Sequence, residues 1–192
     1  MRTSIAIAGA GIGRMLSLLP VAIALCLSPI EARDLPRPGT FAVKHVPEQL
    51  IIYVVHHGPD HIAASFAKLV AYYLKDSLPF TVVFPQMTIS VSDSESWVAV
   101  AYTGEARETG DVKLGTIPAG TVASRVCQGS YERISEAIQG AYRRIAASKK
   151  YLPRPGTPPR LLYWNSPDDH LPRDLITEIQ IPVIERPRGS GK

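Results

Sequence analysis

One order of apolar patterns occurs twice along this sequence, and it limits the folds that the chain can adopt. Each copy begins with a β-branched run that ends at a glycine, continues with apolar residues at helical spacing, and closes with two strand-like runs. Gly58 and Gly129 lie 71 residues apart, and the first apolar residues of the two helical segments, Ile62 and Ile134, lie 72 apart. This spacing predicts an internal duplication of a unit with one helix and about three strands.

The two copies predict similar elements. In the first copy we expect a helix that begins near 62 and ends at 75–77, with strands at 50–55, 87–91 and 97–102. In the second copy we expect strands at 121–127, 160–164 and 175–181, with a helix whose apolar face includes Ile134, Ile138, Ala141, Tyr142 and Ile145. Because neither unit can cover its sheet alone, the two are predicted to pack as one pseudo-symmetric α+β domain.

The first 32 residues have the pattern of a secretory signal peptide. Arg2 and Arg14 give a basic start, an apolar run covers 15–28, and Ala32 is a small residue at a suitable cleavage position. The run is short for a bilayer span and Pro20 interrupts it, so a permanent membrane anchor is the weaker alternative. We therefore predict a signal peptide at 1–32 and export to the periplasm or the medium, with no stable membrane span after cleavage.

Composition places the remainder among ordinary globular domains. The chain is 45% hydrophobic and 20% charged, which excludes the disordered and collagen-like classes. Removal of 1–32 leaves 160 residues with a net charge of +3 and a single cysteine, Cys127. The core then has to stabilise the fold without an internal disulfide. Residues 33–40 are predicted to form an irregular lead-in, and 185–192 a disordered tail.

Four segments of the chain resemble one known family. They are Ile117-Pro-Ala-Gly120, Gln128-Gly-Ser-Tyr131, Tyr163-Trp-Asn-Ser-Pro167 and Leu175-Ile-Thr-Glu-Ile-Gln-Ile-Pro-Val183. Together they resemble the GyrI-like effector-binding domain, the small-molecule module of gyrase-inhibitor-like proteins and multidrug-responsive regulators, which is related to the SOUL haem-binding proteins. The resemblance covers 41–184, with repeat one at 41–104 and repeat two at 114–184.

This resemblance implies a fold and a class of ligand. Two βαββ-type repeats would form an antiparallel sheet with helices on one side, and a groove between the halves would hold a small amphipathic or cationic organic molecule. The sequence departs from the family at Cys127 and Ser130, where other members more often have a histidine and a proline. The sequence shows no helix-turn-helix segment, so we expect no nucleic-acid partner, and the small positive charge does not require one.

Glu178 is the main candidate for the ligand site. It lies in the apolar segment 175–183, and alternation along a strand places it on one face with Gln180 and Pro182. A partly buried carboxylate at this position would attract a cationic ligand. From the spacing alone, an exposed glutamate on a solvated face is the alternative, and the resemblance favours a residue of the groove.

Aromatic residues in the predicted strands are candidates for the walls of the groove. Tyr53, Tyr102 and Tyr163 lie in strands, and Trp97 lies at a strand end. Aromatic rings bind flat or cationic molecules by stacking and by cation–π contact. Simple core packing is the alternative for each of these four residues.

Three other functions remain open. Glu178 would serve a small-molecule hydrolase as a general base if burial raised its pKa. A SOUL-type haem-binding protein and an interaction module that inhibits a protein partner are the other two. His56, His57 and His61 do not have the spacing of a metal site, so we expect no metal and no cofactor. No pattern indicates the oligomeric state.

Overall fold

Antiparallel strand pairing joins most of the chain into one sheet. The computed structural model describes residues 35–58, 62–76, 85–92 and 94–187. The predicted signal peptide at 1–32 lies outside the described residues, as does the end of the predicted tail at 188–192. Within the described ranges, no helix is long and apolar enough to cross a membrane.

The described residues form nine strands, two α-helices and short 3-10 turns. The strands are β1 (Phe41–Val46), β2 (Gln49–His57), β3 (Gln86–Ser90), β4 (Glu95–Ala101), β5 (Lys113–Ile117), β6 (Gly120–Gln128), β7 (Tyr151–Pro153), β8 (Arg160–Tyr163) and β9 (Ile176–Glu185). The helices are α1 (Ile62–Asp76) and α2 (Ile134–Ser148), and the 3-10 turns η2 (Tyr131–Arg133) and η3 (Pro172–Asp174) precede α2 and β9.

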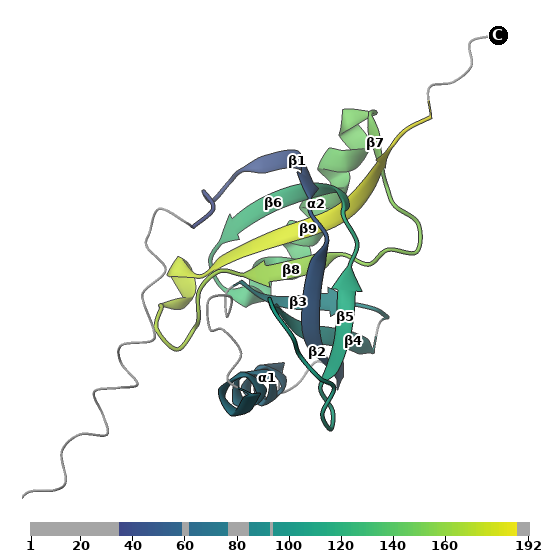
Figure 1. Cartoon of the computed structure of the whole chain (residues 1–192). Helices are drawn as coiled ribbons and strands as arrows, with labels where there is room; N and C mark the ends of the chain where they lie inside the picture. Colours follow the sequence, from purple (N-terminus) through teal and green to yellow (C-terminus); the bar gives the residue numbers. More distant parts are fainter. Residues whose placement is uncertain (1–34, 59–61, 77–84, 93, 188–192) are drawn as a thin grey trace, which may run out of the picture. The chain divides into compact units, whose positions relative to one another are not determined.

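The strand order brings distant segments side by side. It reads β1-β6-β9-β8-β3-β4-β2-β5, and β7 pairs with β9 off this path. Strand β3 joins the two halves by pairing with β8, with Met87 opposite Leu162. The first strand of each half pairs with a strand of the other half. Strand β1 of the first half pairs with β6 of the second, and β5 of the second half pairs with β2 of the first. Figure 1 shows a curled sheet in which β2 and β5 run across the direction of β6 and β9.

Both helices pack on the same face of the sheet, which we call the outer face. Helix α1 buries Leu69 and Tyr73 in a cluster with residues of β2 and β4. Helix α2 buries Ala141 and Ile145 in a second cluster with residues of β6 and β9. Directly opposite residues of neighbouring strands share a face, and the registers from β2 through β3 and β8 to β6 place both clusters on one face.

The opposite face, which we call the inner face, has a third apolar cluster. Its buried members are Ile51, Met87, Ile89, Ala99, Ile117 and Leu162, and Tyr53, Trp97 and Trp164 pack against them. Strand β9 lies between β6 and β8, and it is buried on both faces from residue 176 to 183. The polar side chains that β9 directs to the inner face are therefore removed from water.

The predicted elements are confirmed, with small shifts at their ends. The six predicted strands correspond to β2, β3, β4, β6, β8 and β9, and the two predicted helices to α1 and α2. The pattern does not predict β1, β5 or the three-residue β7. Strands β1 and β5 lie at the two edges of the sheet and contain lysine, histidine or glycine. Tyr142, predicted on the apolar face of α2, is 37% exposed, and β9 continues to Glu185 within the predicted tail.

Leu69 and Leu74 provide a matched pair to test the packing of α1. Leu69 is completely buried, whereas Leu74 is 62% exposed. We predict that Leu69→Ala lowers the free energy of unfolding by about 2–5 kcal/mol, because it removes buried methyl groups and leaves a cavity. Leu74→Ala is expected to change it by less than about 0.5 kcal/mol. Equal losses in urea unfolding would contradict the observed packing.

Candidate functional site

The carboxylate of Glu178 is buried on the inner face. Only 1% of the residue is exposed. Its Oε1 atom accepts hydrogen bonds from Ser124 Oγ at 2.7 Å and from Gln180 Nε2 at 2.9 Å. Its Oε2 atom is also buried and has no hydrogen-bond partner among the described residues. A buried acceptor without a partner costs free energy, so Oε2 is a position at which a donor would stabilise the site.

Lys44 binds the same carboxylate. Its Nζ atom lies 2.7 Å from Oε1 of Glu178, and its side chain is 45% exposed. Lys44 belongs to β1, so the side chain reaches across β6 to contact β9. A lysine can do this because its long apolar stem lies along the sheet while the charged end extends beyond it. The chain thus places its own cation where a cationic ligand of Glu178 would bind.

The surroundings of Glu178 act on its pKa in opposite directions. Burial is the largest single influence and raises the pKa, but hydrogen bonds from Lys44, Ser124 and Gln180 together outweigh it. The pKa of Glu178 therefore lies below its ordinary value of 4.5. The sequence-based hydrolase alternative requires a pKa raised by burial, and this condition is not met, because the donors stabilise the ionised form.

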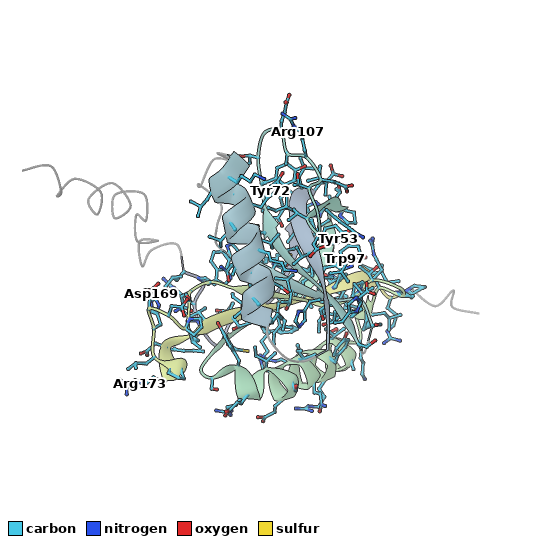
Figure 2. The ribbon with its side chains drawn as sticks, turned by 90° about the horizontal axis from the view of Figure 1, so that it is seen from below. Tyr53, Tyr72, Trp97, Arg107, Asp169 and Arg173 are labelled. Atoms are coloured by element: carbon cyan, nitrogen blue, oxygen red, sulfur yellow. The ribbon has the colours of Figure 1, made fainter. Side chains whose placement is uncertain are left out.

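Tyr53 and Trp97 form a stacked aromatic pair on the inner face. Their ring centroids lie 4.4 Å apart, with 24° between the ring planes. The residues lie diagonally on β2 and β4, Tyr53 opposite Ala99 and Trp97 opposite Val55. Figure 2 shows the two side by side, away from α1. Both rings are partly exposed, so the pair presents an apolar surface to a ligand.

Tyr163 and Tyr102 lie on the outer face, so the structure does not bring them together with Glu178. The ring of Tyr163 packs edge-on against Phe66 of α1 at 6.0 Å between centroids, and its hydroxyl lies 3.1 Å from Thr88 Oγ1. Tyr102 packs against the cluster beneath α1. Both side chains connect helix and sheet, which corresponds to core packing.

Trp164, which is absent from the predicted site residues, lies on the inner face. It packs against the inner-face cluster, and its indole Nε1 is buried without a hydrogen-bond partner among the described residues. Alternation along β8 explains why Trp164, and not the predicted Tyr163, lies on the inner face. Leu162 points to the inner face, so Trp164 does as well, and Tyr163 points outward. The alternation is visible in the sequence, but the choice between the two faces is not.

Basic and polar residues of the site are also missing from the prediction. Lys44 and Ser124 come from β1 and β6, and Arg160 begins β8 opposite Gln180. Arg160 lines a cavity of about 130 Å³ on the inner face, together with Trp97. Neither Glu178 nor Lys44 lines this cavity. The sequence held one indication of these polar neighbours, which is that Gln180 shares a strand face with Glu178.

Asn165 explains one part of the motif on which the family resemblance rests. Its Oδ1 atom accepts a hydrogen bond from the Ile176 amide at 2.7 Å, and its Nδ2 atom donates to the Asp174 carbonyl at 2.9 Å. The Trp164 amide donates to the Ile176 carbonyl at 3.0 Å. These bonds close the loop between β8 and β9 at the residue where β9 begins.

The histidines do not assemble with other potential ligands. No group of three or more His, Cys, Asp or Glu side chains in the described part of the chain is arranged to hold a metal ion. His56 is buried with its Nδ1 atom 3.0 Å from Ser65 Oγ, and His57 is exposed. His61 lies outside the described residues.

Sequence comparison and fold define the same class of protein. The family model of the GyrI-like small molecule binding domain matches residues 86–184, which extend from β3 into β9 and include Glu178. The chain therefore belongs to the GyrI-like small molecule binding domain family. Among curated proteins, none matches this sequence.

Solved structures resemble this fold at low sequence identity. The C-terminal domain of EcmrR matches with a TM-score of 0.63 and 19% identity, over 77% of this chain and 98% of that domain. In the EcmrR–DNA complex, the match spans 58% of the EcmrR chain. A hydrolase from Listeria innocua matches with a TM-score of 0.59 and 16% identity, over 78% of this chain and 94% of its own. A protein bound to tetraphenylphosphonium, SAV2435, matches with a TM-score of 0.52 and 15% identity, over 76% of this chain and 94% of its own.

The effect of Lys44 on Glu178 can be measured directly. We predict that Lys44→Met raises the pKa of Glu178, because burial persists while the nearest cation is lost. In the wild type, the lowered pKa gives stability that is present above pH 4.5 and lost as the pH falls through the folded-state pKa. This acid-dependent loss is expected to be smaller in Lys44→Met. Carbon-13 NMR titration of the glutamate carboxyls measures the pKa.

Lys68→Met is the matched control for this measurement. Lys68 forms an exposed ion pair with Asp111 at 2.8 Å, and its removal is expected to leave the Glu178 titration unchanged. If the pKa of Glu178 stayed the same in Lys44→Met, the ion pair would not control the charge of the site.

Proposed function

We propose that this protein binds a small amphipathic or cationic organic molecule on the inner face of its sheet. The observation that carries the proposal is the buried carboxylate of Glu178, whose Oε2 atom has no partner among the described residues. The stacked Tyr53–Trp97 pair on the same face offers apolar surface to a flat ligand. Membership of a small-molecule binding family supports a small organic partner.

Lys44 limits how well a cation can use this site. Its ammonium already lies 2.7 Å from Glu178, and like charges close to one carboxylate repel each other. A cationic ligand therefore has to displace Lys44 or share the carboxylate with it. An amphipathic ligand that binds the aromatic pair without a positive charge meets no such competition.

The predicted duplication is part of the proposal. The strand order supports it, because β5-β2-β4-β3 in one half corresponds to β1-β6-β9-β8 in the other, with one helix on each half. In a duplicated domain, the groove would follow the inner face on both sides of the β3–β8 pair.

Hydrolysis by Glu178 has less support than binding. A general base acts best when its pKa is near the working pH, whereas the pKa of Glu178 is lowered. The similarity to the Listeria innocua hydrolase, at 16% identity, is a similarity of fold. The similarity to EcmrR in its DNA complex is likewise one of fold, and the absence of a nucleic-acid partner stays a prediction.

The aromatic pair provides the test of ligand binding. We predict that the neutral fluorescent amphiphile N-phenyl-1-naphthylamine binds the wild type, and that Tyr53→Leu weakens this binding about three- to tenfold, the equivalent of one aromatic contact. Tyr102→Leu removes a tyrosine of the outer face and is expected to leave the affinity unchanged. Fluorescence titration measures both, and equal weakening by the two substitutions would exclude the inner face as the site.

Export is the second part of the proposed function. We propose that residues 1–32 direct secretion and are removed after Ala32, as their basic and apolar pattern predicts. N-terminal sequencing of the exported protein is expected to begin at Arg33, and Leu25→Arg, which interrupts the apolar run, is expected to retain the chain inside the cell. Recovery of the wild type only as an uncleaved intracellular chain would contradict this proposal.

A further inference from the structure

A cavity lies at one end of the inner face, and Glu178 is not among its lining residues. Its volume is about 130 Å³. Ile89, Trp97, Ile117 and Val122 supply apolar walls, and the residues come from both halves of the sheet. An engineered apolar cavity of about 150 Å³ holds one benzene molecule, so this cavity has room for one ring or a short alkyl group.

All charge in the cavity lining is positive. Its two charged residues are Arg154 and Arg160, and the lining contains no aspartate or glutamate. Arg154 is exposed, whereas Arg160 is only 6% exposed. The Nε atom of Arg160 is buried without a hydrogen-bond partner among the described residues. The guanidinium of Arg160 therefore borders an apolar cavity, with its Nε atom itself covered by protein.

The charge of Arg160 has no close partner within the described part of the protein. Glu178 acts on it only through space, since no ion pair joins the two, and Oε1 of Glu178 already binds Lys44. Burial lowers the pKa of Arg160, and the negative charge of Glu178 offsets only part of this effect. A buried charge without a hydrogen-bonded partner is costly, so an anion beside Arg160 would stabilise the site.

We propose that the cavity binds the carboxylate end of a small amphipathic acid. Arg160 donates hydrogen bonds to the carboxylate, and the apolar part of the acid lies against Trp97 and Ile89. A guanidinium suits this role because its planar N–H groups match the two oxygens of a carboxylate. The inference rests on the proposed binding of small molecules to the inner face, and it specifies the sign of the ligand's charge.

Three isosteric probes separate charge from shape. Benzoate, benzamide and benzamidine share one ring and one planar substituent, but carry a negative, zero and positive charge. We expect benzoate to bind the full chain about tenfold more tightly than benzamide, the gain of a charge-assisted pair over a neutral one, and benzamidine to bind most weakly. NMR titration gives the affinities, and shifts of the Arg160 Nε–H and Trp97 indole signals locate the probe.

Substitutions of Arg160 test whether this residue causes the preference for benzoate over benzamide. In Arg160→Met, benzoate is expected to lose its advantage over benzamide, while Arg160→Lys keeps the charge and retains part of it. Arg173→Met is the control, because Arg173 is 79% exposed on η3 and lies away from Trp97 in Figure 2. If Arg160→Met does not fold, the wild-type series and Arg160→Lys still decide the question.

The outcomes distinguish this inference from the proposed function. Equal binding of the three probes, or a preference for benzamidine, overturns the anionic ligand but leaves small-molecule binding intact. A benzoate preference that persists in Arg160→Met overturns the role of Arg160. If none of the probes binds and N-phenyl-1-naphthylamine does not bind either, both the inference and the proposed function fail.

Discussion

The pairing of β1 with β6 determines the charge of the inner face. It places Lys44 opposite Val122, on the face to which β9 directs Glu178. A carboxylate that is 1% exposed requires donors, and Lys44 supplies the charged one while Ser124 and Gln180 supply the neutral ones. Had β1 paired with its sequence neighbour β2, this lysine would belong to the other half of the sheet and Glu178 would lack its ion pair.

The two faces of the sheet differ in what packs against them. The outer face holds both helices and most of the apolar packing, and Tyr163 and Tyr102 contribute to that packing. The inner face has no helix among the described residues and combines a stacked aromatic pair with buried charges. Because the curled sheet rather than a helix layer encloses this face (Figure 1), polar groups can be buried there and still border a cavity.

The charges on the inner face change what the family resemblance suggests for this chain. The acidic Glu178 alone would favour a cation, but Lys44 binds it and Arg160 lies nearby without a close partner. Two positive charges therefore accompany one negative charge. The net field decides which small ion gains from binding. The resemblance of the segment around Glu178 to the family therefore suggests a cation, whereas the charges around Glu178 in this chain favour an anion.

Hydrophobic periodicity and short motifs are local properties, so the sequence predicts the two helices, six of the nine strands, the family and the residues that share a strand face with Glu178. It did not determine the edge strands β1 and β5, whose mixed composition carries no clear period. It grouped Tyr163 with Glu178, whereas in the structure Trp164, and not Tyr163, lies on the same face as Glu178. Which face is inner, and which charges meet there, depends on pairing between strands far apart in the chain, because this pairing brings Lys44 and Glu178 together.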